Sequence, residues 1–166
     1  MARAAFYERD KQIRVGEVEV APPGPNEVQI EIAYAGICGT DLHIYHGDMD
    51  WRVAHSQVMG HEISGTVAAV GENVEKFEVG QPVTVMPLDP CGECPACEAG
   101  YSHICHNLDF MGIDTQGGFQ THWTVPEHTV FALPEDLSLR RAALVEPLAV
   151  ACHDVRLGGV EAGDRV

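Results

Sequence analysis

Four cysteines with regular spacing lie close together between Pro90 and His106. The spacing is C-x2-C-x2-C-x7-C, from Cys91 through Cys94 and Cys97 to Cys105. A tight turn can direct the first three sulfurs toward one point, and the fourth returns after a further loop. Four thiolates suit a tetrahedral zinc ion with no open position, which is a structural site. Because this loop has almost no hydrophobic residues of its own, we expect it to need the metal in order to fold.

Two disulfides and an iron–sulfur cluster are the alternatives for these cysteines. Cysteines three residues apart pair awkwardly in a disulfide. The N-terminus has no apolar run of the kind that a secretory signal requires. We therefore expect reduced thiols that bind zinc in a cytoplasmic protein. The sixth cysteine, Cys152, lies in an apolar run, and we expect it to be a small buried residue.

A second set of possible metal ligands is spread along the chain. Cys38 follows a predicted strand and is flanked by glycines, His61 and Glu62 precede another strand, and Glu146 precedes a predicted helix. Separate segments that each contribute a donor are typical of catalytic zinc, which has three protein ligands and one exchangeable position. The alternatives are a buried cysteine, a hydrogen-bonded histidine and a glutamate at a helix N-terminus.

The elements that must position these residues are mostly strands. Residues 27–33 place Val28, Ile30 and Ile32 on one face and Gln29 and Glu31 on the other. Further strand candidates are separated by turns rich in Gly, Pro and Asn, and they lie at 12–20, 63–70, 82–86, 118–125 and 129–133. The pattern predicts a mainly β fold, a partly open antiparallel barrel from which a lobe over 90–106 protrudes.

Helix signals come late in the chain. Ser138 is a candidate N-cap for a helix over 139–144, and Pro147 fits the first turn of a second helix that ends near Gly158. Residues 164–166 look like the opening of another strand, so we expect a fragment with a domain over 1–145 and a connecting segment over 146–166. We expect the helices between 139 and 157 either to be disordered or to bury their apolar face against another copy, giving a homo-oligomer.

The charge of the chain limits its partners. Ten basic and 25 acidic residues give a formal net charge of −15, which would repel nucleic acid. No stretch is long and apolar enough to span a bilayer, so we expect no membrane partner.

Several motifs together carry a resemblance to a known family. They are Gly36-Ile-Cys-Gly-Thr-Asp, Gly60-His-Glu, the Cys91–Cys105 lobe, Gly117-Gly-Phe and Glu146-Pro-Leu. In order and approximate spacing they resemble those of the zinc-dependent medium-chain alcohol dehydrogenases over essentially the whole chain, and most of all those of the polyol (sorbitol) and threonine dehydrogenases. The resemblance implies a GroES-like catalytic domain with two zinc ions, which works with NAD or NADP. We expect the dinucleotide-binding domain of the family to be missing from this chain, because its last glycines do not form G-x-G-x-x-G.

The resemblance also implies roles for individual residues. Cys38 and His61 match catalytic zinc ligands, and Glu62 matches the third ligand or a close neighbour. A glutamate at the position of Glu146 binds the zinc or holds its water in polyol-type relatives. Thr40 resembles the hydroxyl that bonds the substrate oxygen, and His43 resembles the relay that carries the proton to solvent.

We therefore expect the catalytic domain of an NAD(P)-linked dehydrogenase that oxidises a polyol, vicinal diol or other secondary alcohol by hydride transfer. The fragment alone is expected to bind zinc without appreciable turnover. One alternative is a zinc-binding interaction module without chemistry, which would hold one zinc and be unaffected by replacement of Cys38. Another is a metal-free quinone reductase relative, a class that has this fold but lacks both cysteine patterns.

Overall fold

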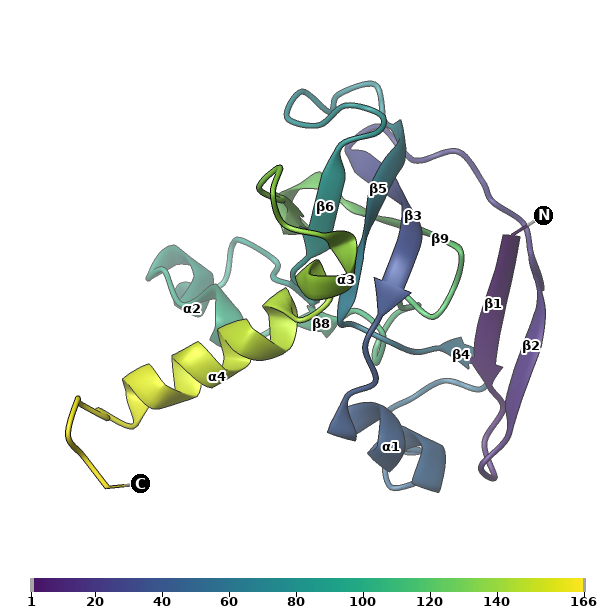
Figure 1. Cartoon of the computed structure of the whole chain (residues 1–166). Coiled ribbons are helices and arrows are strands. Elements are labelled where there is room, and N and C mark those ends of the chain that lie inside the picture. The colour runs from purple at the N-terminus through teal and green to yellow at the C-terminus, as the bar shows by residue number, and fades with distance from the viewer. Residues whose placement is uncertain (1, 166) are drawn as a thin grey trace.

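The structure is a computed structural model that describes residues 2–165, and it is built mainly from antiparallel strands (Figure 1). The strands are β1 (Ala2–Tyr7), β2 (Ile13–Val18), β3 (Glu27–Ala35), β4 (Gln57–Val58), β5 (Ile63–Val70), β6 (Pro82–Val85), β7 (Leu88–Asp89), β8 (Asp109–Phe110), β9 (His122–Pro126) and β10 (Val130–Ala132). The helices are α1 (Gly39–His46), α2 (Pro95–Glu98), α3 (Leu139–Ala142) and α4 (Val145–Leu157), with 3-10 turns at Ser102–Ile104 and Glu127–Thr129.

Two sheets form the body of the domain. The larger has the strand order β10-β6-β5-β3-β9, the smaller has β2-β1-β4, and both remain open. A bridge between Ala4 and Gln120 and a hydrogen bond from the Ala5 amide to the Phe119 carbonyl (2.9 Å) connect them. The expected partly open antiparallel architecture is therefore confirmed.

The main core lies on the inner face of the larger sheet. Val28 and Ile30 of β3 are fully buried there, as the alternation of β3 predicts. They pack with other apolar side chains of the sheet and its flanking loops: Ile63, Val67, Val83, Val85, Met111, Trp123, Val125 and Val130. A second core formed by Tyr7, Ile44, Val53, Met59 and Ile113 joins β1 to α1 and β4.

The predicted strands of the larger sheet are all present, but β9 is shorter than the expected 118–125. It begins at His122, because residues 117–119 bond to residues 58–60 instead of continuing the sheet. The sequence did not reveal β1, whose segment is rich in alanine, a helix-forming residue. Antiparallel pairing with β2 outweighs that propensity.

Helix α1 was also missing from the expected elements. Its N-cap is Cys38, and Asp41 accepts a hydrogen bond from the Cys38 amide through Oδ2 (2.9 Å). At its C-terminal end Gly47 has φ +90°, a left-handed conformation that glycine adopts without steric cost.

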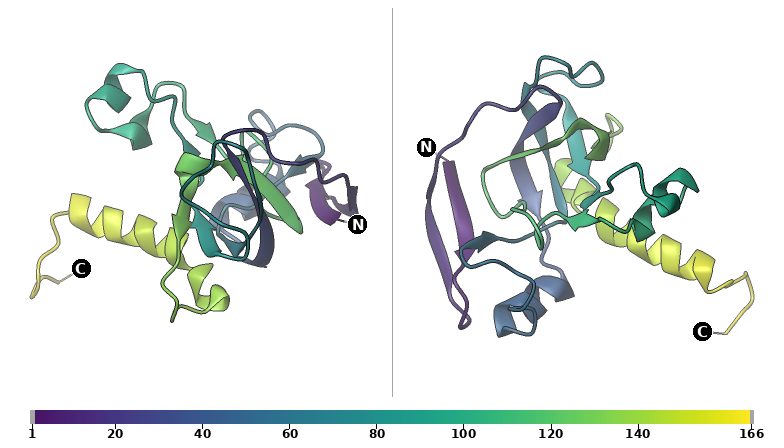
Figure 2. Two further views of the ribbon diagram at one scale, coloured as in Figure 1. Left: turned by 90° about the horizontal axis from the view of Figure 1, so that it is seen from above. Right: turned by 180° about the vertical axis from the view of Figure 1, so that it is seen from behind.

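The C-terminal helices confirm the two predicted from sequence, with small shifts. Ser138 is the N-cap of α3, and α4 ends at Leu157 just before Gly158. Helix α4 starts at Val145, so Glu146 lies in its first turn and not before it. Figure 2 shows α4 projecting from the sheets on the same side as the lobe that carries α2, and the rings of His103 and His153 meet there with centroids 5.3 Å apart.

Two expectations for this region are wrong. Cys152 is exposed on α4 and not buried, because the apolar face of this helix has no covering element within residues 2–165. Asp164 and Arg165 are not in a strand, and Val166 lies outside the described residues. No helix within residues 2–165 has both the length and the apolar character needed to cross a bilayer.

Candidate metal centres

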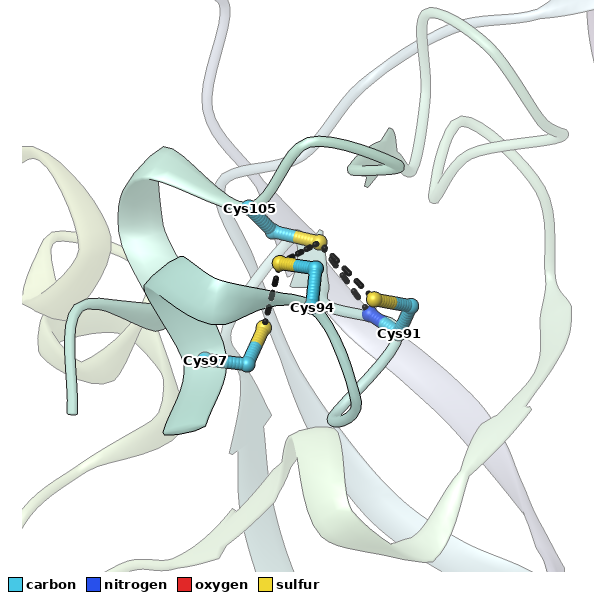
Figure 3. A group of neighbouring side chains, drawn as sticks. All are labelled: Cys91, Cys94, Cys97 and Cys105. Carbon is cyan, nitrogen blue, oxygen red and sulfur yellow. Dashed lines mark hydrogen bonds between the residues drawn. The ribbon is translucent and has the colours of Figure 1, made fainter. Parts of the chain in front are cut away.

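The four lobe cysteines converge as their spacing predicts (Figure 3). The sulfur of Cys105 lies 3.4 Å from that of Cys91 and 3.8 Å from that of Cys94, and the sulfurs of Cys94 and Cys97 are 3.5 Å apart. A tetrahedron with zinc–sulfur bonds of about 2.3 Å has edges of about 3.8 Å. A disulfide would need about 2.05 Å, and all four thiols are free. The residues present therefore fit a four-thiolate zinc site.

Backbone amides favour the thiolate form of Cys94, whereas burial raises the pKa of Cys97 to about 12. Helix α2 begins at Pro95 directly after Cys94, and the amides of His106 and Asn107 donate to the sulfurs of Cys94 and Cys105 at 3.5 and 3.3 Å. The amide of His106 is the main cause that lowers the pKa of Cys94 to about 6. Backbone donors stabilise a thiolate, which is the form that binds metal.

The second candidate centre is assembled by the pairing of β3 with β5. Ala35 of β3 lies opposite Ile63 of β5, and the Gly36 amide donates to the carbonyl of Glu62 at 2.7 Å. Cys38 follows three residues after Ala35, at the start of α1, so this register brings it to the segment of His61 and Glu62. One ligand atom each of Cys38, His61 and Glu62 lies within 4.8 Å of the others.

A cation at this centre would offset the cost of burying its carboxylates. His61 and Glu62 are buried, and so is Asp41, which the sequence analysis did not single out as a site residue. Asp41 Oδ1 lies 4.0 Å from His61 Nδ1, and neither atom has a hydrogen-bond partner. Burial raises the pKa of Asp41. Among residues 2–165, no Lys or Arg pairs with these carboxylates, so the donor set of sulfur, nitrogen and oxygen fits a zinc ion.

A sequence signal for Asp41 exists in retrospect. It is the third residue after Cys38, where an acidic side chain can cap the N-terminus of a helix. A histidine that binds metal through one ring nitrogen commonly directs the other toward a carboxylate. Asp41 has that place beside His61.

Glu146 reaches the same region from the other end of the chain. Ser64 Oγ donates to the carbonyl of Leu139 at 2.6 Å, which fixes α3 against β5 just before α4 begins. Burial is the main cause that raises the pKa of Glu146 to about 7, and the negative charges of Glu62 and Asp41 raise it further. Glu146 is nevertheless outside the group whose ligand atoms lie within 4.8 Å, so the geometry favours Glu62 as the third ligand.

The other two residues singled out from the sequence lie on α1. Thr40 is partly buried in the first turn, two residues after Cys38. His43 is exposed, and its Nδ1 lies 3.2 Å from Asp48 Oδ2. Helix α1 therefore runs from the candidate metal centre to the protein surface.

Comparison with known proteins adds independent findings. Residues 24–135 match the model of the alcohol dehydrogenase GroES-like domain. The chain is 56% identical over 162 residues to 2-dehydro-3-deoxy-L-galactonate 5-dehydrogenase of Pseudoalteromonas atlantica, an alignment that covers 98% of this chain and 48% of that protein. It is 44% identical over 147 residues to L-threonine 3-dehydrogenase of Pyrococcus furiosus, covering 87% of this chain and 42% of that protein.

A solved structure gives the same picture. A putative zinc-binding dehydrogenase from Sinorhizobium meliloti, bound to NADP, superposes with a TM-score of 0.91 at 36% identity, covering 98% of this chain and 47% of that one. The chain thus spans about half the length of the relatives it matches.

Proposed function

The chain belongs to the family of alcohol dehydrogenase GroES-like domains, and from this membership we propose that it is the catalytic domain of a zinc-dependent, NAD(P)-linked dehydrogenase. The domain extends over residues 1–145, with a structural zinc lobe at 90–106, and residues 146–166 connect it to a dinucleotide-binding domain. The observation that carries the proposal is the convergence of Cys38, His61 and Glu62 at the junction of β3 and β5.

Cys38, His61 and Glu62 would hold the catalytic zinc, with Glu146 beside them, and the four lobe cysteines would hold the structural zinc. When bound, the catalytic ion supplies Lewis-acid stabilisation of negative charge on the substrate oxygen. Asp41 keeps His61 oriented, since its carboxylate faces the His61 ring from the end of α1 that carries Cys38.

The remaining steps belong to α1. The hydroxyl of Thr40 orients the substrate oxygen by accepting or donating one hydrogen bond. His43 takes up the proton that leaves the substrate and transfers it to water, for which its exposure and its contact with Asp48 suit it. NAD or NADP, held by the dinucleotide-binding domain, would supply the nicotinamide that accepts the hydride.

The substrate class that we propose is a secondary alcohol in a polyol, vicinal diol or hydroxy acid. One relative is named for oxidation at carbon 5 of a sugar acid and another for oxidation at carbon 3 of threonine. Both positions carry a secondary hydroxyl group. Six free thiols suit a reducing compartment, so we place the protein in the cytoplasm.

Metal content tests this function against a non-catalytic zinc module. We expect two zinc ions per chain, and Cys38→Ser should remove one of them while leaving the lobe loaded. Cys152→Ser is the matched control, because this exposed thiol belongs to neither group of ligand atoms, and its replacement should leave both ions bound. One zinc ion per chain, indifferent to Cys38→Ser, would instead support the module.

Ligand binding tests the chemistry directly. In the chain loaded with Co²⁺, a secondary alcohol at millimolar concentration should shift the visible spectrum of the centre that depends on Cys38. We expect no NAD⁺ or NADP⁺ reduction by this chain alone, since the sequence has no G-x-G-x-x-G. A spectrum indifferent to every alcohol tested would contradict the assignment of a substrate-binding metal.

A further inference from the structure

The segment that delivers His61 has little support from its own sheet. Strand β4 consists of Gln57 and Val58, and it pairs with β1 through only these two residues. Residues 59–62 then run without further strand structure until β5 begins at Ile63. Two ladder pairs do not hold an extended segment firmly, so the position of His61 must depend on other contacts.

Those contacts come from residues 112–119, which include the Gly117-Gly-Phe motif. The Val58 amide donates to Gln116 Oε1 at 2.7 Å, and the Gln57 side-chain amide donates to the Thr115 carbonyl. Three consecutive amides donate to the three residues before His61: Gly117 to the Val58 carbonyl at 2.6 Å, Phe119 to the Met59 carbonyl at 2.9 Å and Gly118 to the Gly60 carbonyl at 2.8 Å.

Glycine is what allows this approach. Gly60 has φ +91° and Gly112 has φ +92°, which other residues rarely adopt. A Cβ on Gly117 would come within 3.0 Å of the Gly60 and Met59 carbonyl oxygens, and one on Gly112 would come equally close to the Gly60 carbonyl. These obstacles are backbone atoms, so they could not move aside without moving the segment that ends in His61.

The polar contact of the His61 ring is a weak one, because the Asp41 carboxylate faces its Nδ1 at 4.0 Å without a hydrogen bond. Its Nδ1 has no hydrogen-bond partner, although the ring is buried. Its only ring contact of the aromatic kind among residues 2–165 is the edge of Phe110, with centroids 5.2 Å apart and planes at 87°. Phe110 comes just before residues 112–119, and the Asp114 carboxylate accepts a hydrogen bond from its amide at 2.9 Å.

We propose that residues 112–119 are a positioning element for His61: three consecutive amides fix the backbone of residues 58–60, directly before His61, so that the imidazole faces Cys38 before metal binds. The inference rests on the metal centre of the proposed function. It assigns to the Gly117-Gly-Phe motif a role in metal affinity, in addition to holding the two sheets together.

Gly117→Ala tests this role in the chain loaded with Co²⁺. The variant should lower the Co²⁺ affinity of the centre that depends on Cys38 by about 10- to 100-fold, which is the usual effect of disturbing the residues that support a metal ligand. The affinity of the lobe should stay unchanged. Chelator competition followed through the thiolate–Co²⁺ absorption measures both affinities, and Cys38→Ser identifies which of the two phases belongs to which centre.

Gly158→Ala is the matched control. Gly158 has φ −68° at the end of α4, and an added Cβ would meet only Asp154, Val155 and Val160, none of them a metal ligand, so Gly158→Ala should change neither affinity. Gln116→Ala adds no volume and removes one acceptor for the Val58 amide, so it should weaken the same centre by about tenfold or less. Gln116→Glu keeps the acceptor oxygen and should restore the affinity.

The outcomes separate this inference from the function on which it rests. A wild-type chain with a single metal ion refutes the proposed centre itself. A wild-type chain with two ions, whose Gly117→Ala and Gln116→Ala variants keep the affinity of the Cys38 centre, refutes only the positioning role. If Gly117→Ala fails to fold, the Gln116 pair decides alone.

Discussion

The two candidate metal centres are built in opposite ways. The lobe takes all four ligands from one short stretch, Cys91 to Cys105, and its only core is formed by cysteines with Ala96 and Leu108 beside them. The other centre takes Cys38, His61 and Glu62 from segments that β3 and β5 bring together. The lobe therefore has metal ligands but almost no hydrophobic core of its own, whereas the ligands of the second centre are positioned by a packed sheet that does not need the metal.

This difference predicts how much of the folding free energy of each region comes from metal binding. A metal bound by a segment without its own core contributes folding free energy directly. A metal bound at the edge of a packed sheet adds to a stability that burial in the sheet already provides. Removal of metal should thus unfold one region and leave the other in place.

The largest expected effect is on the lobe. Removal of zinc by a chelator should abolish amide protection in residues 91–107, because zinc binding of about 10–16 kcal/mol is comparable with the whole stability of a domain. Hydrogen exchange measures this, with the amides of β3 and β5 as the internal control. Protection that persists in the lobe after zinc loss would remove the contrast between the two centres.

Cys38→Ser should strongly lower the metal content of the chain and change its folding stability little. We expect loss of one ion of two, because a neutral hydroxyl is a poor replacement for a thiolate ligand. The melting temperature of the apo chain should stay close to that of the wild type, since Cys38 lies outside the buried core clusters. Metal analysis and thermal unfolding measure the two quantities, and global unfolding of the variant would contradict a framework independent of metal.

The same contrast explains which features the sequence could reveal. Local spacing predicted the lobe, alternation predicted β3, and flanking turn residues predicted β5, because all three signals depend on neighbours in the chain. The shortening of β9 depends on residues 58–60, which lie more than 50 residues before Gly117, and the existence of β1 depends on its pairing with β2 and β4, which overrides its alanine-rich sequence. No local pattern reports such pairings.

Site residues divide in the same way. Cys38, His61 and Glu62 were singled out as metal donors on separate segments, the family motifs added their roles, and β-strand register accounts for their convergence. Asp41 was missed because α1, the helix that places it beside His61, was not predicted either. Cys152 was placed in a core because its neighbours are apolar, but that pattern does not say whether a covering element exists.

A smaller effect is expected at Asp41. Asp41→Asn keeps an oxygen that accepts from the Cys38 amide but removes the charge that faces His61 Nδ1. The variant should lower the metal affinity of the Cys38 centre by about 10- to 100-fold and leave the metal affinity of the lobe unchanged.

Asp41→Ala is the companion variant. It should show the same loss of metal affinity, and in addition it should destabilise the apo chain by about 1 kcal/mol because α1 loses its cap. Equal metal affinity in the wild type and both variants would show that the Asp41 carboxylate does not support His61.

The smallest effect concerns the loop that joins the two ligand-bearing segments of the second centre. The buried Tyr7 donates its hydroxyl to Asp50 Oδ1 at 2.8 Å, which fixes residues 47–56 between α1 and β4. Tyr7→Phe should lower the free energy of unfolding by about 1 kcal/mol, in the presence and absence of zinc alike. A loss seen only in the zinc-free chain would mean that the metal, and not the framework, holds this centre together.

The pH dependence gives that variant a distinct signature. Burial is the main cause that raises the pKa of Tyr7 from 10.0 to about 12, with the Asp50 hydrogen bond adding to it. Because the folded pKa is the higher one, the contribution of Tyr7 is fully present below pH 10 and decreases as the pH rises toward 12. Urea unfolding at several alkaline pH values should therefore show the wild type and Tyr7→Phe converging in stability. A stability difference between the two proteins that stays constant up to pH 12 would indicate that the Tyr7 hydroxyl titrates alike in the folded and unfolded chain. Other contacts, such as the bidentate pair of Arg52 with Asp114, would then hold the loop.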